Sequence, residues 1–286
     1  MMKLQLLGAT LLASACAAAA ANGVAPVHFS GKIVSAANAR PQKLAVFADC
    51  QDGRARIQGS TDGGAYRIDL PPGITCVMML GEQTWDSDPQ VVFDARTALP
   101  LPMRVYPRQV PEPALARELF EMGEQDSAMR HAVAAAPGDA ALQQRLARDD
   151  GARSRRLAQI IADKGWPTHS MVGAPAARGA WLVAQHAPAQ DLKRWLALMQ
   201  DAARRHEMNL PNLATSVDRV LVNDGKPQRY GTQFHARADG TIVLRPIEDA
   251  AHVDARRYGM GLSSLAQNLA VMAPAPQREA ARPAAN

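Results

Sequence analysis

A polar segment at residues 223–233 carries the side chains best suited to bind or transform a ligand. Its sequence is Asn-Asp-Gly-Lys-Pro-Gln-Arg-Tyr-Gly-Thr-Gln, so amide, phenol, hydroxyl and cationic groups lie among two glycines and a proline. A turn that only connects two elements needs Gly, Pro and Asn, and the other donors and acceptors exceed that need. We therefore predict a site for a polar ligand that includes Gln228, Tyr230, Thr232 and Gln233.

Proton transfer is the chemistry that His186 could add to this site. Histidine titrates near neutral pH, which suits a general base, and His186 follows Gln185 at the end of an apolar helical segment. If Asp218 shares the pocket, its carboxylate could orient the imidazole ring. Alternatively, His186 stabilises the C-terminal end of a helix or binds a backbone carbonyl, and the sequence leaves both interpretations open.

Three arginines near the polar segment could hold an anionic group. Arg219, Arg256 and Arg257 carry planar guanidinium groups that match a carboxylate or a phosphate. Pairing with Asp249 or Asp254 would give the same sequence pattern, and we expect such pairing for at least one arginine. The complete set of predicted binding residues is Gln185, Arg219, Gln228, Tyr230, Thr232, Gln233, Asp249, Arg256 and Arg257.

Metal-dependent and serine-dependent chemistry have no supporting pattern. His206-Glu207 lacks a second histidine four residues on, where Leu210 stands, and His235 and His252 have no ligand-like spacing. No Gly-x-Ser-x-Gly motif is present. We therefore expect neither a metal nor a cofactor.

The elements that must position these residues are mainly helices. Pro107, Pro111 and Pro113 separate the two halves of the chain, since each proline fixes its own backbone angle and disfavours helix in the residue before it. Apolar residues then recur at helical spacing, Pro137-Gly138 ends the first helix, and Asp139 can cap the second. We expect helices near residues 115–133, 139–161, 175–186, 191–207, 213–222 and from Ser263 onward, and a hairpin of residues 228–236 and 241–246 around Asp239-Gly240.

Two carboxylates fall on the apolar stripes of the first two predicted helices. Asp126 and Asp150 would face the core there, and a carboxylate in that place needs a partner. Each is either an ion-paired structural residue or part of a pocket wall. We favour the structural interpretation because ion-pair networks often only hold helices together.

The first half of the chain shows short apolar runs separated by turn residues. The turn signals recur about every ten residues, which is typical of a β-sandwich. Cys50 and Cys76 lie in this half, and we expect them to form a disulfide because two thiols of an exported chain usually pair. The predicted fold class is α+β with several domains: a β-sandwich at residues 24–108, a mainly helical domain with a β-hairpin at residues 111–272, and a disordered Ala/Pro-rich tail at residues 273–286.

The first 21 residues are predicted to be a secretory signal peptide. Lys3 precedes a short apolar segment and an alanine run that ends at Ala21, where cleavage would precede Asn22. The apolar segment of roughly nine residues is too short for a membrane span, which takes about 20. We expect a periplasmic or secreted protein. The alternative is a lipoprotein anchored at Cys16, because Ala13-Ser14-Ala15-Cys16 resembles a lipoprotein box with Ala where Leu is usual.

Charge and composition narrow the class of partner. The net charge is +5, but the arginines are interleaved with Asp and Glu instead of forming a run. This distribution indicates a solvated surface and argues against nucleic-acid binding. The partner that we expect is a polar small molecule or a component of the cell envelope, and contact with the membrane would come only through a lipid anchor.

Two resemblances to known families add to this prediction. Residues 61–73, Thr-Asp-Gly-Gly-Ala-Tyr-Arg-Ile-Asp-Leu-Pro-Pro-Gly, resemble the carboxypeptidase-regulatory-like, transthyretin-like modules, and this resemblance implies a structural or adhesive, non-catalytic first half. Residues 115–272 resemble a bacterial family known as domain of unknown function 6624, which implies an architecture but no activity; Arg153 stands where that pattern leads us to expect Asn. The segments that carry the second resemblance include Gly165-Trp166-Pro167, residues 181–187, Asp218-Arg219-Val220, residues 225–233, residues 246–249 and residues 253–257.

Three hypotheses for function follow. The first is an exported envelope protein that binds a ligand or a partner at a polar site in its helical domain. The second is a metal-independent hydrolase or lyase with His186 as general base and Asp218 as its orienting carboxylate. The third is a purely structural protein, in which the polar segment locks the hairpin to the helices.

Overall fold

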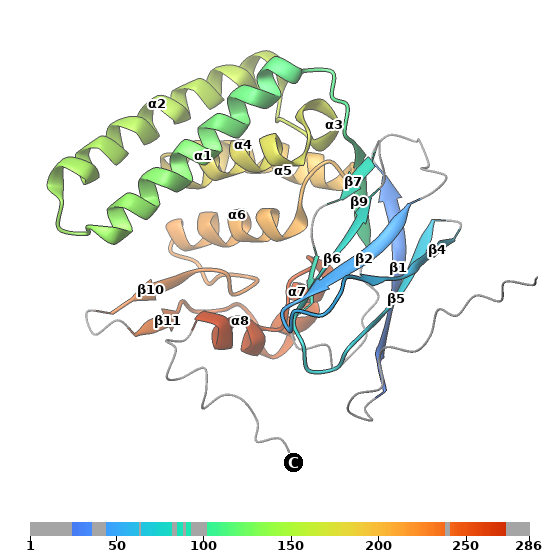
Figure 1. The fold of residues 1–286 in the computed structure, drawn as a ribbon. Coiled ribbons are helices and arrows are strands. Elements are labelled where there is room, and N and C mark those ends of the chain that lie inside the picture. Colours follow the sequence, from blue (N-terminus) through green and yellow to red (C-terminus); the bar gives the residue numbers. More distant parts are fainter. Residues whose placement is uncertain are drawn as a thin grey trace, which may run out of the picture.

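The protein has an N-terminal region of strands and a mainly helical C-terminal region, so the predicted α+β class is confirmed (Figure 1). The computed structural model describes residues 25–35, 44–62, 64–81, 85–87, 90–92, 102–237 and 241–272. The predicted signal peptide, the lipid-anchor site at Cys16, the turn at Asp239-Gly240 and the predicted disordered tail lie outside the described residues.

The N-terminal region contains two sheets. One is five-stranded in the order β4-β5-β1-β9-β7, and β1 pairs antiparallel with β5 and parallel with β9. The other is four-stranded in the order β3-β2-β6-β8. The strands are β1 (Val27–Ser35), β2 (Ala45–Cys50), β3 (Ile57–Gln58), β4 (Ser60–Asp62), β5 (Ala65–Leu70), β6 (Cys76–Gly81), β7 (Trp85–Ser87), β8 (Gln90–Val92) and β9 (Met103–Pro107).

Alternating burial explains how these strands form a core. Along β5 the side chains of Tyr66, Ile68 and Leu70 are buried and the intervening ones are exposed, because successive residues of a strand point to opposite faces. One hydrophobic cluster contains buried side chains from both sheets, among them Ile68 of the five-stranded sheet and Met78 and Leu80 of the four-stranded sheet. Burial of these apolar surfaces stabilises the N-terminal region.

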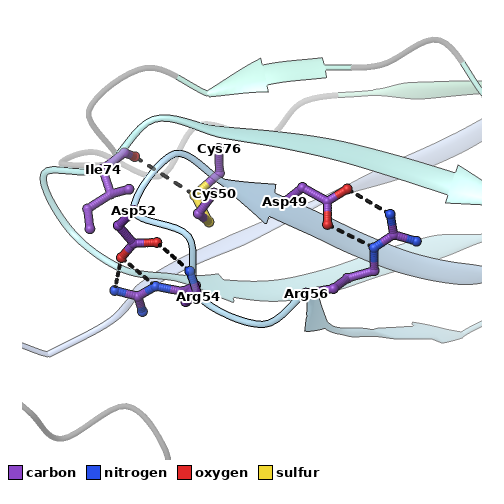
Figure 2. Close-up of a disulfide and its surroundings, with 7 residues drawn as sticks. All are labelled: Asp49, Cys50, Asp52, Arg54, Arg56, Ile74 and Cys76. Atoms are coloured by element: carbon purple, nitrogen blue, oxygen red, sulfur yellow. Dashed lines mark hydrogen bonds and ion pairs between the residues drawn. A yellow bond between two sulfur atoms is a disulfide. The ribbon is translucent and has the colours of Figure 1, made fainter.

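The predicted disulfide between Cys50 and Cys76 is present. The two residues lie opposite each other at the end of the antiparallel pair β2 and β6 (Figure 2). Ion pairs flank this end: Asp49 accepts two hydrogen bonds of 2.8 Å from the guanidinium of Arg56. The crosslink closes a long loop, which stabilises the folded state by restricting the unfolded chain.

The helical region follows the predicted order of helices. Asp139 caps α2, since its Oδ1 accepts hydrogen bonds from the backbone N–H groups of Ala141 and Leu142 at 2.9 and 3.0 Å. Helices α1, α2 and α4 pack on one another, as do α5 and α6 (Figure 1). The long helices are α1 (Pro113–Ala135), α2 (Ala140–Lys164), α4 (Ala174–His186), α5 (Ala189–Arg204) and α6 (Leu210–Asn223).

Several short elements differ from the prediction. The hairpin strands β10 (Phe234–Ala236) and β11 (Ile242–Leu244) are shorter than expected, and the short helices α3 (His169–Val172) and α7 (Val253–Gly259) were not predicted. Helix α8 (Leu265–Met272) begins with a capping box one residue later than the predicted cap. Ser264 Oγ accepts from the N–H of Gln267, and Gln267 Oε1 accepts from the N–H of Ser264.

The two regions touch through specific contacts. Gln90 of β8 donates a hydrogen bond of 2.8 Å from Nε2 to the carbonyl of Gly261. The rings of Tyr106 in β9 and His169 in α3 lie 4.9 Å apart between centroids. The helical region nevertheless has a hydrophobic cluster of its own, built from buried residues of α1 to α6.

Candidate functional site

A close crossing of α1 and α4 places the candidate site. A Cβ added to Gly179 would lie 2.1 Å from the carbonyl oxygen of Leu119, and one added to Gly123 would lie 2.6 Å from the Cα of Gly179. Only glycine lets the two backbones approach so closely. Asp126 lies three residues after Gly123, and His186 lies seven after Gly179, so each is on the face of its helix that meets the other.

Asp126 and His186 form a buried hydrogen-bonded pair at this crossing. Nδ1 of His186 lies 2.9 Å from Oδ2 and 3.1 Å from Oδ1 of Asp126. The Asp126 side chain is 1% exposed, whereas that of His186 is 22% exposed. Burial raises the pKa of the Asp126 carboxyl, but the hydrogen bonds and positive charges of His186 and Arg130 outweigh burial, so the net direction is downward.

The same nitrogen of His186 also lies close to a donor, the guanidinium of Arg130. Nε of Arg130 lies 2.9 Å from Nδ1 of His186 and 3.2 Å from Oδ2 of Asp126. Because a carboxylate lies so close to Nδ1, we assign the ring proton to that nitrogen, and the Arg130 N–H then bonds to Asp126. Nε2 of His186 makes no hydrogen bond within the described part of the chain and is not a buried atom there. A neutral His186 therefore presents a lone pair on Nε2 to solvent.

Asp150 and Arg153 of α2 extend the pair into an ion-pair network. Arg130 donates to Asp150 Oδ2 at 2.8 Å, and Arg153 donates to Asp150 Oδ1 at 2.7 Å and lies 3.6 Å from Asp126. Asp126 and Asp150, the two carboxylates on the apolar helix faces, thus each have a cationic partner on a neighbouring helix. Arg153, at the position where the family pattern leads us to expect Asn, is a member of this network.

Arg219 of α6 brings an additional positive charge. One of its terminal nitrogens donates to the carbonyl of Gln185 at 3.1 Å, its Nε is buried with no partner among the described residues, and no carboxylate there pairs with it. Burial, and then the charge of Arg130, lower the pKa of the Arg219 guanidinium. Asp126, Arg130, Asp150, Arg153, Gln185, His186 and Arg219 are hereafter the His186 cluster.

Gln185, like Arg153 with its buried Nε, is a further residue of the His186 cluster with an unused polar atom. It is 4% exposed, and its Nε2 donates to Ser216 Oγ at 2.5 Å. Its Oε1 is buried and has no partner within the described residues. Buried polar atoms are normally hydrogen-bonded, so the unused donor on Arg219 and the unused acceptor on Gln185 are exceptions to that rule within the described residues.

Asp218 has a different role from the one expected. Its buried carboxylate accepts hydrogen bonds from the N–H groups of Arg229, Tyr230 and Thr232 at 2.7, 3.0 and 2.9 Å and from Thr232 Oγ1 at 2.8 Å. All these partners belong to the polar loop, and the carboxylate bonded to His186 is Asp126 instead. Asp218 therefore organises the loop and does not orient the imidazole ring.

Gln228 is also used within the loop. It is fully buried, its Nε2 donates to the carbonyls of Gln233 and Arg245 at 2.9 Å each, and its Oε1 accepts from the N–H of Gln233 at 2.7 Å. These bonds tie the loop to the chain after β11. The polar atoms of Gln228 are thus occupied by the protein itself.

The C-terminal arginines hold the other side of the loop. Arg257 is buried and donates to the carbonyls of Ser263 and Tyr230 at 2.6 Å each. Arg256 donates to the carbonyl of Arg229 at 2.9 Å and lies 3.5 Å from the Asp249 carboxylate. The pairing expected for at least one arginine is thereby confirmed. Of the predicted binding residues, Tyr230, Thr232 and Gln233 remain partly exposed beside this network.

A cavity of about 520 Å³ lies between the strands and the helices, away from the residues predicted to form the site. Trp166 and Pro167 of its lining belong to a segment that carries the family resemblance. The cavity itself requires β6, β7 and β9 to meet α1, α4 and α6, which no local pattern predicts. Its lining includes Tyr106, Phe120, Glu124, Trp166, His169, Arg178, Trp181, Glu207, Met208 and Asn212.

The described residues contain neither a metal-binding cluster nor a membrane-spanning helix. No group of three or more His, Cys, Asp or Glu side chains in this part of the chain is arranged to hold a metal ion. None of the helices described is both long and apolar enough to cross a membrane.

Comparison with known proteins identifies the family of this chain. The model of a family described as "Family of unknown function (DUF6624)" matches residues 113–276, which is more than half of the chain. Neither a curated protein nor a solved structure matches. The matched range contains all residues of the His186 cluster and the polar loop.

Proposed function

Since the chain belongs to the Family of unknown function (DUF6624), whose description gives no activity, we propose a function from the geometry of the His186 cluster. The protein is an exported binding module whose helical domain holds a small polar ligand with an anionic group. The anionic group of the ligand accepts from Arg219, and hydrogen-bond donors of the same ligand face Oε1 of Gln185 and Nε2 of His186.

The net positive charge of the His186 cluster is the main observation that supports this proposal. The cluster contains three arginines and two aspartates, so its net charge is one positive charge when His186 is neutral. Asp126 and Asp150 are engaged by Arg130 and Arg153, so Arg219 is the cation without a counter-ion among the described residues. A partly buried guanidinium is costly without a partner, and a carboxylate or phosphate supplies one.

Phosphate binding by the purified protein tests this proposal. Inorganic phosphate is titrated into the parent and into Arg219→Gln, and heat of binding is measured by calorimetry. We expect the variant to bind at least about tenfold more weakly, the loss typical of one charged hydrogen-bond donor. Arg117→Gln, an exposed arginine of α1 outside the cluster, is the matched control. Equal affinity in all three proteins would refute the anion site.

A second candidate function is a metal-independent hydrolase or lyase. It is favoured by the Asp126–His186 pair, in which the carboxylate holds Nδ1–H and leaves Nε2 open as a base. Chromogenic esters and amides are suitable first substrates. Turnover that persists unchanged in His186→Gln would exclude this function, whereas loss of turnover with retained phosphate binding would support it.

The polar loop is, in this proposal, a structural corner. The hydrogen bonds made by Asp218, Gln228 and Arg257 to loop backbone groups support that assignment. The loop stabilises the C-terminal end of α6, the helix that carries Arg219. It thus positions the ligand-binding arginine without contacting the ligand itself.

The N-terminal region is proposed to be a β-sandwich of the carboxypeptidase-regulatory-like type with a structural or adhesive role. Two sheets that share one hydrophobic cluster support this proposal. Export to the periplasm or the medium is supported by the leader sequence and by the Cys50–Cys76 disulfide, which forms in oxidising compartments. Lipidation at Cys16 is the alternative to release.

A further inference from the structure

The cavity between the two regions has an aromatic, negatively charged lining, whereas the His186 cluster is polar and positively charged. Aromatic side chains from both regions line it: Tyr106 from β9, Phe120 from α1, Trp166 before α3 and Trp181 from α4. Phe120 is 45% exposed, an unusual exposure for a large apolar side chain, whereas Trp166 is buried. The volume of about 520 Å³ falls within the range of small-molecule sites.

A buried carboxylate shares this lining. Glu207 is 7% exposed, and its two oxygens accept hydrogen bonds from the N–H and Oγ of Ser170 at 2.9 and 2.5 Å. No Lys, Arg or His side chain of the described residues lies within ion-pair distance of it. Each carboxylate oxygen can accept a further hydrogen bond, and a buried negative charge without a counter-ion is costly. Glu207 is thus an anion without a counter-ion among the described residues, as Arg219 is a cation without one.

Two exposed charges also line the cavity. Glu124 of α1 adds a second negative charge, and Arg178 of α4 adds a positive one, and neither is ion-paired within the described part of the chain. With Glu207, the lining carries two carboxylates and one guanidinium, so its net charge is negative when His169 is neutral. Water screens the charges of Glu124 and Arg178 alike because both side chains are exposed, so the buried Glu207 is the dominant charge of the lining.

We propose that this cavity binds an organic ammonium ion, with the cationic head among the aromatic rings and beside Glu207. Aromatic faces attract cations, and the attraction is strongest where water is excluded. A quaternary or alkylated ammonium group is the chemistry that matches both the rings and the carboxylate, because its methyl groups pack on the rings while its charge compensates Glu207. This site is separate from the His186 cluster and does not depend on the function proposed for it.

Choline, tetramethylammonium and 3,3-dimethylbutan-1-ol test the proposal as probes. The alcohol has the shape of choline but lacks its charge, so it separates cation recognition from simple filling of an apolar space. Binding to the purified protein is followed by calorimetry and by shifts of the Trp indole N–H signals in NMR spectra. We expect both cations to bind with indole shifts, and the neutral alcohol to bind at least about tenfold more weakly.

Two variants assign the binding to this cavity. Phe120→Ala removes an exposed ring and is expected to keep the fold and weaken choline binding by about threefold to tenfold. Glu207→Gln removes the buried charge and is expected to reduce the preference for choline over the alcohol. Leu198→Ala is the control, because Leu198 of α5 is an apolar side chain that is 39% exposed and lies outside the cavity. Absence of choline binding, equal binding of the alcohol, or unchanged binding in Phe120→Ala would overturn the proposal.

Discussion

Gly123 of α1 and Gly179 of α4 meet so closely that a Cβ added to Gly123 would lie 2.6 Å from the Cα of Gly179. This contact sets the separation of the two helices. It therefore also sets the distance between Asp126 and His186, which follow the glycines on the same faces of α1 and α4. The candidate site depends on two residues that have no functional side chain.

Gly179→Ala is expected to destabilise the protein, although alanine favours helix. The new Cβ would lie 2.1 Å from the Leu119 carbonyl oxygen, so the helices must separate, at a cost of about 1–3 kcal/mol typical of overpacking. Urea unfolding followed by circular dichroism measures the change. Gly151→Ala, a glycine of α2 with room for a methyl group, is the control and is expected to stabilise by about 0.5–1 kcal/mol. A Gly179→Ala variant as stable as Gly151→Ala would contradict the close crossing.

Asp126→Asn is expected to flatten the acid dependence of stability. The pKa of Asp126 is lower in the folded protein than its usual value of 3.8, so its contribution to stability is present above that value and is lost as pH falls through the folded pKa. The parent therefore loses stability from about pH 4 downward, and the variant loses less over the same interval. Chemical unfolding at successive pH values gives the two slopes. Parallel slopes in the parent and Asp126→Asn would show that this carboxyl is not stabilised in the folded state.

Asp218→Asn distinguishes a structural loop from a catalytic carboxylate. An amide can accept with only one oxygen and carries no charge, so several bonds to the N–H groups of Arg229, Tyr230 and Thr232 are weakened or lost. We expect a loss of about 2–3 kcal/mol in the free energy of unfolding. Asp249→Asn, an exposed aspartate beside the loop, is expected to change stability little. Full stability in Asp218→Asn together with loss of an activity would instead favour catalysis.

Removal of the disulfide is expected to destabilise the strand region. Cys50 and Cys76 are 26 residues apart, and closure of a loop of that length contributes about 3.5 kcal/mol in the chain-entropy model. A Cys50→Ala, Cys76→Ala double variant is therefore expected to unfold at lower urea concentration. The parent under reducing conditions provides the comparison, and both are expected to show similar losses. No loss in either would mean that the strand pairing of β2 and β6 suffices alone.

Much of the fold follows from local sequence signals. Apolar periodicity and turn residues predict the long helices, the cap at Asp139 is confirmed, and the pairing of Cys50 with Cys76 follows from the small number of cysteines after the predicted leader. The helix signals lie within a few neighbouring residues, and the disulfide could be predicted because few cysteines are available to pair. The short helices α3 and α7 were missed because a few residues do not establish helical periodicity.

The candidate site was less predictable, for a physical reason. His186 and Arg219 were identified from their residue types, but the partner of His186 is set by a helix crossing, and Asp126 lies 60 residues away in the chain. Asp218 precedes the polar loop, which favours it in the sequence as the partner of His186, yet its carboxylate accepts its hydrogen bonds from that loop. Sequence proximity favoured Asp218, whereas the glycine contact favours Asp126.

NMR of the arginine side chains tests the central claim most directly. The Nε–H signals of the arginines and the ring nitrogens of His186 are recorded while inorganic phosphate is added. We expect the Arg219 Nε–H and His186 Nε2 signals to shift together and to saturate, because the buried donor of Arg219 gains a partner. The exposed Arg117 signal is expected to stay nearly constant. Absence of any shift, or equal unsaturated shifts at Arg219 and Arg117, would contradict an anion-binding site at the His186 cluster.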